Sequence, residues 1–543
     1  MQPTRPHKYV TCVVQALCRG GDISSSSGLL FDHEGGVVLT HSTFLLPHLS
    51  RSNLTMSTKS LEDELSFSVI LEKFQVHPLP DESREKQSVA RRTLLSLKAK
   101  FVGSFRCEKF GDDLLEMMPQ NQGWKFAETP HTTDDKESSK TKSGLPQDES
   151  ESFFFHMLQE FVILQIEDFK LHENDVIYRK LALLTPSDLA VGDNLYVLGT
   201  PFGDSSPHIF MNSVSKGILS IFGSKGALLL TDARCIPGEE GGIVLTDVIE
   251  SDDLNQRCII GMVVAPLCWK AGELVGLSLV CNIISLLSSL VKNFPEYKER
   301  CSNALADRFP RQYSMTCIPS AVRTSCVLVR CSIHWGSGVL LDARTVLTCS
   351  HVVQGSKTVI VHIDGKIVRG RTIYATPTGD PFDVAVVSLD LGLRGGYGRL
   401  TFAESLIEGE DVFSIGYPLF DERCSDTPTI TKGIVSKVNC VDGLAVMIQT
   451  DCVINQGASG GLLINSAGEI MGIVACNCRD TEMKASYPHV NLAIPTMAIM
   501  PTVKEYLRTR DVGVLVNLHV SSPAVRRLWS VDLVEQKDLK SKL

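Results

Sequence analysis

Residues 337–348 read SGVLLDARTVLT, which is two short aliphatic runs separated by the connection Asp342-Ala343-Arg344. Residues 27–40 read SGLLFDHEGGVVLT, the same pattern with two extra residues in the connection. Short runs of β-branched and aliphatic residues that flank a polar or glycine-rich turn are typical of β-hairpins. The two stretches therefore predict one hairpin that occurs twice in the chain.

The repetition extends well beyond this hairpin. Five blocks match in the same order along the chain: 27–40 with 337–348, 192–201 with 409–418, 216–218 with 432–434, 231–242 with 450–461, and 261–265 with 471–475. No single block is specific, whereas an ordered series of five predicts two related domains in tandem.

Both copies consist of short apolar runs with close turns and few helical periods, which predicts an all-β fold of the barrel or sandwich type. The length of 543 residues exceeds that of one barrel-type domain, which is about 200–250 residues. We predict domains at about 1–300 and 301–515, followed by a C-terminal tail at 516–543 that is weakly structured after about residue 520. Residues 131–152 are almost wholly polar, so we expect an exposed loop inserted in the first domain.

Net charge, cysteine usage and the motifs that are missing exclude several classes of partner and of protein. The net charge of −9 argues against nucleic acid, because phosphate binding needs a basic field. The 17 cysteines have no regular spacing, which indicates a reducing or mildly reducing intracellular compartment and not a secreted disulfide scaffold. We expect no secretory signal and no membrane span. No phosphate-binding loop or zinc-type cysteine spacing occurs, so we expect neither cofactor nor metal.

Three residues in the second copy form a candidate catalytic triad. His351 follows an apolar run in VLTCSHVV, Asp383 precedes one in PFDVAVVSLD, and Ser459 lies among glycines in NQGASGG. Each residue alone has an ordinary structural explanation. Their order along the chain is that of the chymotrypsin arrangement. The glycines let the backbone turn sharply, so the amides of Gly457 and Ser459 are candidates for an oxyanion hole.

These motifs resemble those of a known family. TCSHVV is similar to the TAAHVV of trypsin-like proteases of the Deg (HtrA) group, FDVAVV to their acid-bearing strand, and GASGG to their GNSGG. The resemblance covers about residues 320–500. It implies a chymotrypsin-like double β-barrel and a serine endopeptidase. It also implies that Ser459 is the nucleophile, His351 the general base, and Asp383 the group that orients the histidine.

Two departures from the trypsin pattern bear on activation and specificity. Ala458 stands where secreted trypsins carry an aspartate, so activation by a newly cut amino terminus is not available. Val453 stands where trypsins carry the aspartate of the specificity pocket. A buried cation without a partner is costly. We therefore expect a preference for small or apolar residues, cysteine included, immediately before the cleaved bond.

The first copy lacks this chemistry. The histidine position falls on Thr43, the serine position on Glu240, and the acid position near Glu160. We predict a degenerate, catalytically inactive domain. A regulatory or docking role and a purely structural role both stay open.

The sequence ends in Ser541-Lys542-Leu543, which resembles a peroxisomal import signal. A tandem protease-like chain with this tripeptide resembles the peroxisomal members of the Deg group. That likeness implies the peroxisomal matrix, an import receptor as partner, and imported precursors of fatty-acid β-oxidation enzymes as substrates of leader removal. It also implies self-cleavage in the N-terminal half, for which Cys107 in the region 103–152 is our candidate, because we expect a preference for cysteine and expect this residue to be exposed. A non-catalytic pseudoprotease scaffold, an esterase and a homo-oligomer remain open alternatives.

Overall fold

The computed structural model describes residues 11–32, 35–49, 58–78, 88–119, 122–126, 153–170, 188–203, 205–247, 257–270, 273–306, 318–363, 365–392, 400–420, 427–480 and 485–530. The chain divides into two compact units, Met1–Met315 and Thr316–Leu543. The predicted loop at 131–152 and the terminal tripeptide at 541–543 lie outside the described residues.

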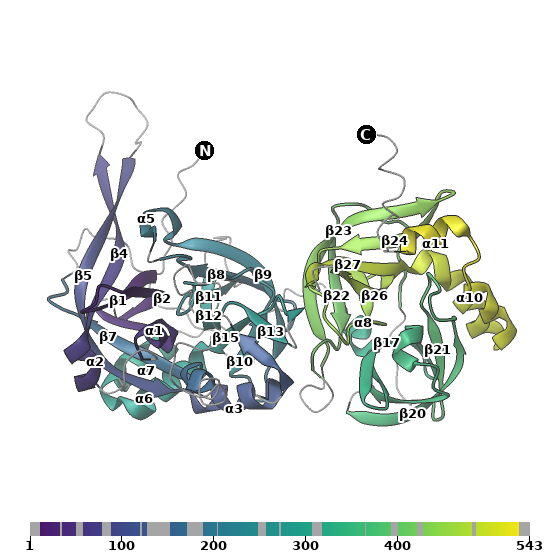
Figure 1. Cartoon of the computed structure of the whole chain (residues 1–543), viewed down its shortest axis with the longest axis horizontal. Coiled ribbons are helices and arrows are strands. Elements are labelled where there is room, and N and C mark those ends of the chain that lie inside the picture. Colours follow the sequence, from purple (N-terminus) through teal and green to yellow (C-terminus); the bar gives the residue numbers. More distant parts are fainter. Residues whose placement is uncertain are drawn as a thin grey trace, which may run out of the picture. The chain divides into compact units, whose positions relative to one another are not determined.

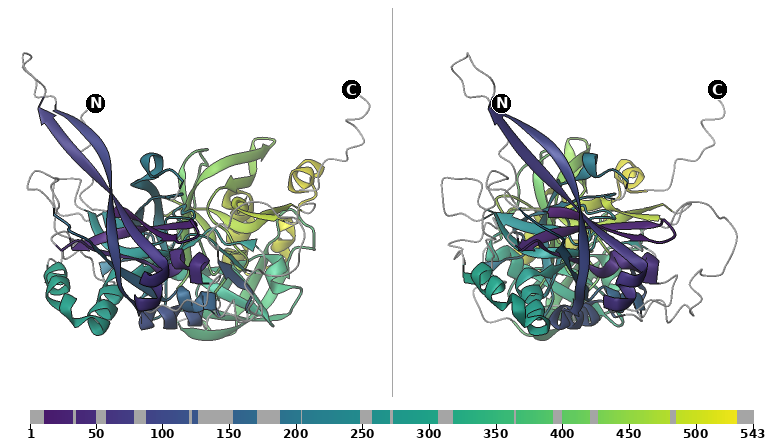
Figure 2. Two further views of the ribbon diagram at one scale, coloured as in Figure 1. Left: turned by 60° about the vertical axis from the view of Figure 1, so that its left-hand side comes forward. Right: turned by 90° about the vertical axis from the view of Figure 1, so that its left-hand side faces the viewer.

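The first unit contains two closed six-stranded barrels (Figure 1). The strands of its first barrel, in spatial order, are β1 (Thr11–Cys18), β2 (Ile23–Asp32), β3 (Val37–His41), β7 (Glu160–Ile166), β5 (Ser88–Arg106) and β4 (Leu65–Pro78). Those of its second barrel are β8 (Asn194–Gly199), β9 (Ser213–Phe222), β10 (Leu228–Thr231), β15 (Ser278–Asn282), β12 (Arg257–Ala265) and β11 (Ile243–Asp247). Strands β4 and β5 extend far beyond the first barrel as a twisted hairpin (Figure 2).

The second unit repeats this architecture with the same spatial order of strands. Its first barrel consists of β16 (Cys326–Cys331), β17 (His334–Asp342), β18 (Thr345–Thr348), β21 (Ala385–Leu389), β20 (Lys366–Ala375) and β19 (Thr358–Ile363). Its second barrel consists of β22 (Asp411–Gly416), β23 (Thr429–Val441), β24 (Leu444–Thr450), β27 (Ala485–Pro495), β26 (Ile470–Asp480) and β25 (Leu462–Asn465). The predicted all-β class and the tandem double barrels are confirmed.

Helices are short and lie at the margins of the barrels. In the first unit they are η1 (Ser42–Leu45), α1 (Leu46–Leu49), α2 (Thr58–Glu64), α3 (Glu108–Met117), α5 (Pro207–Phe210), α6 (Ile283–Asn293), η4 (Pro295–Tyr297) and α7 (Lys298–Ala306). A small sheet there joins β6 (Trp124–Phe126), β13 (Cys268–Lys270) and β14 (Glu273–Leu274). In the second unit the helices are α8 (Ser320–Ser325), α9 (Ser350–Val353), α10 (Thr496–Thr509), η5 (Val512–Leu518) and α11 (Pro523–Trp529).

Each barrel closes on aliphatic and aromatic side chains, because alternate residues of a strand point inward. The first barrel is filled by residues such as Val14, Phe67, Phe101 and Leu164, and the last by Val412, Ile448, Leu463 and Val474; all eight are buried. No helix within the described residues is both long and apolar enough to cross a lipid bilayer.

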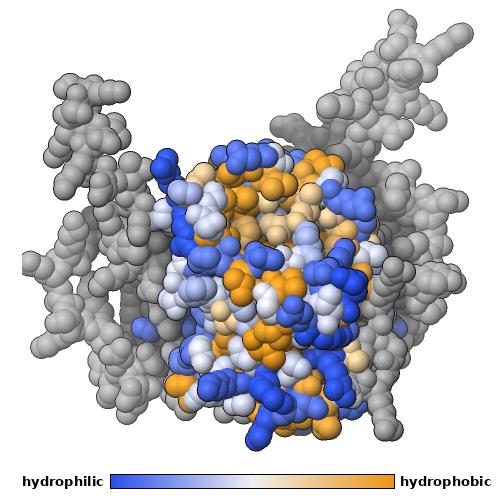
Figure 3. Space-filling view, turned by 90° about the vertical axis from the view of Figure 1, so that its right-hand side faces the viewer, coloured by the Kyte–Doolittle hydropathy of each residue, from blue (hydrophilic) through white to orange (hydrophobic). Residues whose placement is uncertain are grey.

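The expectation of a weakly structured tail after about residue 520 is wrong for its first part, which includes α11 (Pro523–Trp529). The segment that follows α10 continues as η5 and α11. Leu515, Leu518, Val520 and Val525 of this segment are buried, so it is held by the same apolar packing that holds the barrels. Figure 3 views the side of the molecule on which α10 lies, where apolar and hydrophilic residues are interspersed. The first unit also extends to residue 315, beyond the predicted boundary at about 300.

Candidate active site

Two neighbouring strands bring His351 and Asp383 together. Thr348 at the end of β18 pairs with Ala385 at the start of β21. The histidine therefore follows one strand end, in α9, while the aspartate precedes the adjacent strand. The Asp383 carboxylate accepts a hydrogen bond from the His351 amide (N to Oδ1, 3.0 Å) and contacts the imidazole Nδ1 through Oδ2. Both side chains are accessible to solvent, at 53% and 29% exposure. Asp383 thus holds the ring by Nδ1 and leaves Nε2 for a proton transfer.

Ser459 lies in a tight turn that the first barrel of its unit supports. Gly457 and Gly460 adopt φ values of 98° and 86°, which side chains rarely tolerate. A Cβ on Gly460 would stand 2.1 Å from the Ser337 carbonyl oxygen, so only glycine fits there. Ser337 on β17 donates its amide to the Ser459 carbonyl (2.8 Å) and its hydroxyl to the Gly457 carbonyl (2.8 Å). The turn is therefore fixed in position by a strand of the histidine-bearing barrel.

The serine turn and the histidine helix meet around shared neighbours. A Cβ on Gly336 would lie 2.5 Å from Val352 in α9 and 3.1 Å from the Ser459 carbonyl oxygen. The Cys349 sulfur contacts the Val474 carbonyl (3.3 Å), which also accepts the Gly460 amide (2.8 Å). These contacts bring the turn beside α9.

The Cys349 thiol lies close to the His351 and Asp383 side chains. Its sulfur, an imidazole nitrogen of His351 and a carboxylate oxygen of Asp383 lie within 4.8 Å of one another. The hydrogen bond from the Ser459 hydroxyl to the imidazole is not formed among the described contacts of these two residues. Such bonds are often long in enzymes without substrate and tighten when substrate binds.

The amides of Gly457 and Ser459 donate no hydrogen bond to any described part of the chain, whereas their neighbours Ala458 and Gly460 do. In the first unit, the equivalent pair of amides donates to a carboxylate. There Glu240 takes the serine position, and its carboxylate accepts the Gly238 amide (N to Oε2, 2.7 Å). Its own amide also lowers its pKa by hydrogen bonding, although burial dominates and raises that pKa to about 7.

The surrounding contacts make this correspondence secure, because they recur bond for bond. Ser27 contacts the Gly238 carbonyl and the Thr200 amide at 2.8 Å, as Ser337 contacts the Gly457 carbonyl and the Tyr417 amide. Gly238 has the same φ of 98° as Gly457. The turn of the first unit is therefore the same structure, with a carboxylate in place of the hydroxyl. Backbone amides in this geometry donate hydrogen bonds to an anionic oxygen.

The strand register also settles the other two positions of the degenerate site. Thr40 pairs with Val162 in the first unit as Thr348 pairs with Ala385 in the second. Thr43 therefore corresponds to His351, and Glu160 to Asp383, as the sequence predicted. His41, two residues before Thr43, is fully buried, and desolvation lowers its pKa to about 4. Its ring contacts Thr43 and the Leu158 carbonyl, so it is held as a neutral structural residue.

Val453 is 3% exposed, and its carbonyl accepts the Thr431 hydroxyl (2.8 Å). Two polar residues of β27 flank the same stretch: the Asn491 side-chain amide donates to the Cys452 carbonyl (2.7 Å), and the His489 ring contacts the Asp451 carbonyl (3.1 Å). Sequence reasoning missed both, since no motif marks them.

The expectation that Cys107 is exposed is wrong. Its side chain is 0% exposed at the start of α3, and its sulfur lies 3.8 Å from that of Cys281 on β15. That contact is the main reason its pKa is lowered to about 7. The apolar residues of α3 and α6 exclude water here, and their spacing along the sequence did not reveal that they cover this position.

Comparisons with known proteins agree with this geometry. A family model described as a trypsin-like peptidase domain matches residues 336–473, which include His351, Asp383 and Ser459. The "Peroxisomal leader peptide-processing protease" of Homo sapiens is 33% identical over 86% of this chain and 79% of that protein. The protein of the same name from Mus musculus is 37% identical over 65% of this chain. The chain spans 62% of the mouse protein's length.

Among solved structures, a serine endoprotease from Yersinia pestis is similar at 26% identity over 35% of this chain and 65% of that chain, with a TM-score of 0.29. The architecture of the present chain rests on its own strand order.

Proposed function

The chain belongs to the family of peroxisomal leader peptide-processing proteases, and on that premise we propose that it is a serine endopeptidase that acts through His351, Asp383 and Ser459. It is a peroxisomal protein. One observation carries the proposal: a histidine held by an aspartate lies beside a glycine-flanked serine, and neither the amide of that serine nor that of Gly457 donates to any described residue.

Each residue has a distinct step. The Ser459 hydroxyl is a weak nucleophile at neutral pH and needs an adjacent base. His351 Nε2 takes the proton as the oxygen attacks the peptide carbonyl, and later gives it to the leaving amine. Asp383 keeps the ring oriented by its contact with Nδ1. The amides of Gly457 and Ser459 stabilise the negative oxygen of the tetrahedral intermediate, which is the place that a carboxylate takes in the first unit.

The test uses a labelled peroxisomal precursor and a fluorophosphonate probe, which reacts with activated serines. Wild-type protein should cut the precursor and take up the probe, and Ser459→Ala should do neither while keeping its fold. N-terminal sequencing of the products would identify the removed leader. Equal cutting by the Ser459→Ala protein would refute the triad. A folded wild-type chain that neither cuts nor labels would favour a pseudoprotease scaffold, and cleavage of ester substrates alone would favour an esterase.

The substrates we propose are imported matrix precursors, including enzymes of fatty-acid β-oxidation. Val453 supports a preference for small or apolar residues before the cleaved bond, because no carboxylate stands at that position to pair with a lysine or arginine. A peptide library should accordingly favour alanine, valine or cysteine there. Val453→Asp should raise the share of basic residues, and a wild-type preference for lysine or arginine would contradict the assignment.

Self-cleavage in the N-terminal half is a further proposal. Cutting at Cys107 would require α3 to open first, because the residue is 0% exposed in the folded unit. Intact mass measured over time should fall for the wild-type chain and stay constant for Ser459→Ala. Sequencing the new N-terminus would then establish or exclude Cys107.

We also propose that Ser541-Lys542-Leu543 binds a soluble import receptor. The receptor should bind a peptide with this ending, and replacing Leu543 by Asp should abolish that binding and leave the full chain outside peroxisomes.

A further inference from the structure

Asp380 is a buried carboxylate only three residues from the catalytic Asp383. Its side chain is 0% exposed and lies in the loop between β20 and β21. Within that loop Asp380 Oδ1 accepts the Phe382 amide at 3.2 Å. A buried carboxylate without charged or polar partners is strongly unfavourable, so its position depends on the groups that surround it.

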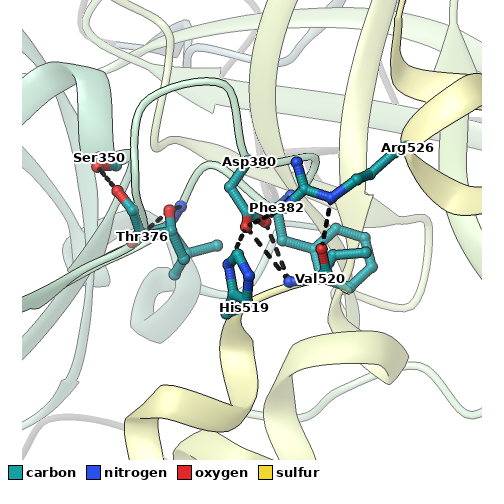
Figure 4. A network of polar contacts seen from close by, with 8 residues as sticks. Ser350, Thr376, Asp380, Phe382, His519, Val520 and Arg526 are labelled. Atoms are coloured by element: carbon teal, nitrogen blue, oxygen red, sulfur yellow. Dashed lines mark hydrogen bonds and ion pairs between the residues drawn. The ribbon is translucent and has the colours of Figure 1, made fainter. Parts of the chain in front are cut away.

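Those groups come from the C-terminal end of the described chain, as Figure 4 shows. His519 Nδ1 lies 2.5 Å and Arg526 Nη2 3.2 Å from Asp380 Oδ2, and the Val520 amide donates to the carboxylate at 3.3 Å. Arg526 also donates Nε to the Val520 carbonyl at 2.8 Å. We call the segment from Arg510 to Ser530 the C-terminal strap.

The strap is fixed to both barrels of the second unit. At its start, Arg510 forms an ion pair with Asp342 on β17 (2.5 Å) and donates to the Thr345 hydroxyl (2.9 Å), both in the first barrel. At its end, Trp529 Nε1 donates to the Val446 carbonyl of β24 in the second barrel (3.0 Å). The Asp380 contacts lie between these two anchors. The strap therefore fixes the acid-bearing loop relative to both halves of the catalytic unit.

The same loop is tied to the histidine from the other side. The base of the loop is closed by hydrogen bonds between Thr376 and Val384 (2.9 to 3.2 Å). The Ser350 hydroxyl, next to His351, donates to the Thr376 carbonyl at 2.7 Å (Figure 4). A shift of Asp380 would thus be passed along a short, closed loop to the carboxylate that orients the imidazole.

We propose that Asp380, His519 and Arg526 are positioning residues, and that the C-terminal strap holds Asp383 against His351 through the Asp380 carboxylate. This inference rests on the proposed function. It adds a dependence of catalysis on residues beyond 510, which lie outside the trypsin-like match at 336–473. Misplacing a catalytic group by about 1 Å can lower a rate about 100-fold. Loss of these contacts should therefore lower the rate, although the three residues do not contact the substrate.

The test compares full-length Asp380→Asn and Arg526→Gln with wild type in hydrolysis of a peptide substrate. Both variants should lower kcat per folded molecule about 10- to 100-fold, with KM changed less than about twofold. Arg526→Lys, which keeps the positive charge, should recover part of kcat. Matched controls are Asp390→Asn and Arg371→Gln, which break an exposed pair of the same barrel at 3.5 Å and should leave kcat unchanged.

The outcomes separate this proposal from the catalytic one. Thermal unfolding and circular dichroism report the folded fraction, and His519→Gln removes a single contact if Asp380→Asn fails to fold. A lowered Tm with unchanged kcat per folded molecule, or a changed KM alone, would overturn the positioning role. An inactive wild type, or activity retained by Ser459→Ala, would instead overturn the proposed function.

Discussion

At the scale of single residues, the side chain at the serine position is one of three that differ between the two copies of this site. Glu240 and Ser459 occupy the same glycine turn, with matched backbone φ values and matched serine supports at Ser27 and Ser337. The glutamate folds back onto the amides that would receive an oxyanion. The serine side chain is too short to do so, and the amides of Gly457 and Ser459 donate to no described residue. The difference between a filled and an open anion site therefore follows from side-chain length and charge alone.

Asp383→Asn should leave the hydrogen bond from the His351 amide in place but remove the negative charge beside Nδ1. An asparagine can present its amide group to the ring and favour the wrong tautomer, so kcat should fall about 10⁴-fold. Steady-state hydrolysis of a peptide at pH 7 to 8 would measure this loss. Asp390→Asn is the matched control, and a fall smaller than about tenfold would argue against Asp383 as the orienting acid.

Glu240→Gln should stabilise the first unit at alkaline pH. Burial raises the pKa of Glu240 to about 7 from an ordinary value of 4.5. The folded state thus holds a proton that the unfolded state releases, and ionisation in the fold costs stability as pH rises from about 4.5 to 7. Above pH 7 the cost is about 3 kcal/mol. Glutamine keeps the acceptor oxygen and avoids this cost.

Urea unfolding of the Glu240→Gln and wild-type chains at pH 5 and pH 8 tests the sign. The stability difference should be large at pH 8 and small at pH 5. Glu299→Gln, on an exposed helix position, should show no such dependence. A Glu240→Gln chain that is less stable than wild type at pH 8 would mean that the charge is favourable in the turn.

At the scale of secondary-structure elements, the candidate site is formed by residues at the ends of neighbouring strands. The ends of β18 and β21 carry the histidine and the aspartate because the two strands pair. The turn before β25 carries the serine, and β17 supports that turn from the neighbouring barrel through Ser337. In the first unit the equivalent hairpin, β2–β3, supports the turn that carries Glu240. Duplication thus preserved the supporting elements while the reacting residues diverged.

Ser337→Ala should lower both stability and activity. It removes the hydrogen bonds of the Ser337 hydroxyl with the Tyr417 amide and the Gly457 carbonyl, which costs about 1–3 kcal/mol, and it loosens the serine turn. Ser27→Ala removes the equivalent contacts in the first unit and is the matched control. It should destabilise that unit by a similar amount and leave kcat unchanged. Equal kcat losses in both variants would contradict the assignment of catalysis to one turn.

At the scale of the whole molecule, the chain is two copies of one double-barrel architecture, and the second copy carries the three residues that we propose as a catalytic triad. Glu240 fills the anion site of the first unit, and Thr43 cannot serve there as a base at neutral pH. The neighbouring His41 is buried and turned to the Leu158 carbonyl. We therefore propose that the first unit contributes no second active centre; a regulatory role and a structural role both stay open for it.

A chain with Ser459→Ala and Glu240→Ser should accordingly remain inactive. The new serine would have open amides and an acid at Glu160, but no histidine at the base position. Uptake of a fluorophosphonate probe, followed by mass spectrometry of the labelled peptide, would measure this for each unit. Labelling of the serine introduced at residue 240 would show that the first unit retains a base we have not identified.

Much of this was predictable from local sequence. Repeated blocks predicted the duplication, and alternation of short apolar runs predicted the barrels. The glycines around Ser459 and the apolar runs beside His351 and Asp383 marked the site, because turns and strand ends are governed by residues close in sequence. The expected exposure of Cys107 was wrong because its burial depends on contacts such as that with Cys281 of β15, which lies 174 positions away along the chain.

The sequence by itself determined that two related all-β domains exist, and it predicted which residues would carry the reaction and that one copy lacks them. Only the tertiary structure decided that Glu240 occupies its own anion site and that the Asp380 carboxylate is held from residues 519 to 526. The reason is physical: Arg526 and Asp380 are 146 positions apart, and the turn in which Glu240 meets the Gly238 amide is supported by Ser27, 211 positions from Gly238. The strength of these contacts comes from the exclusion of water and the loss of alternative partners on folding, which no local pattern of residues encodes.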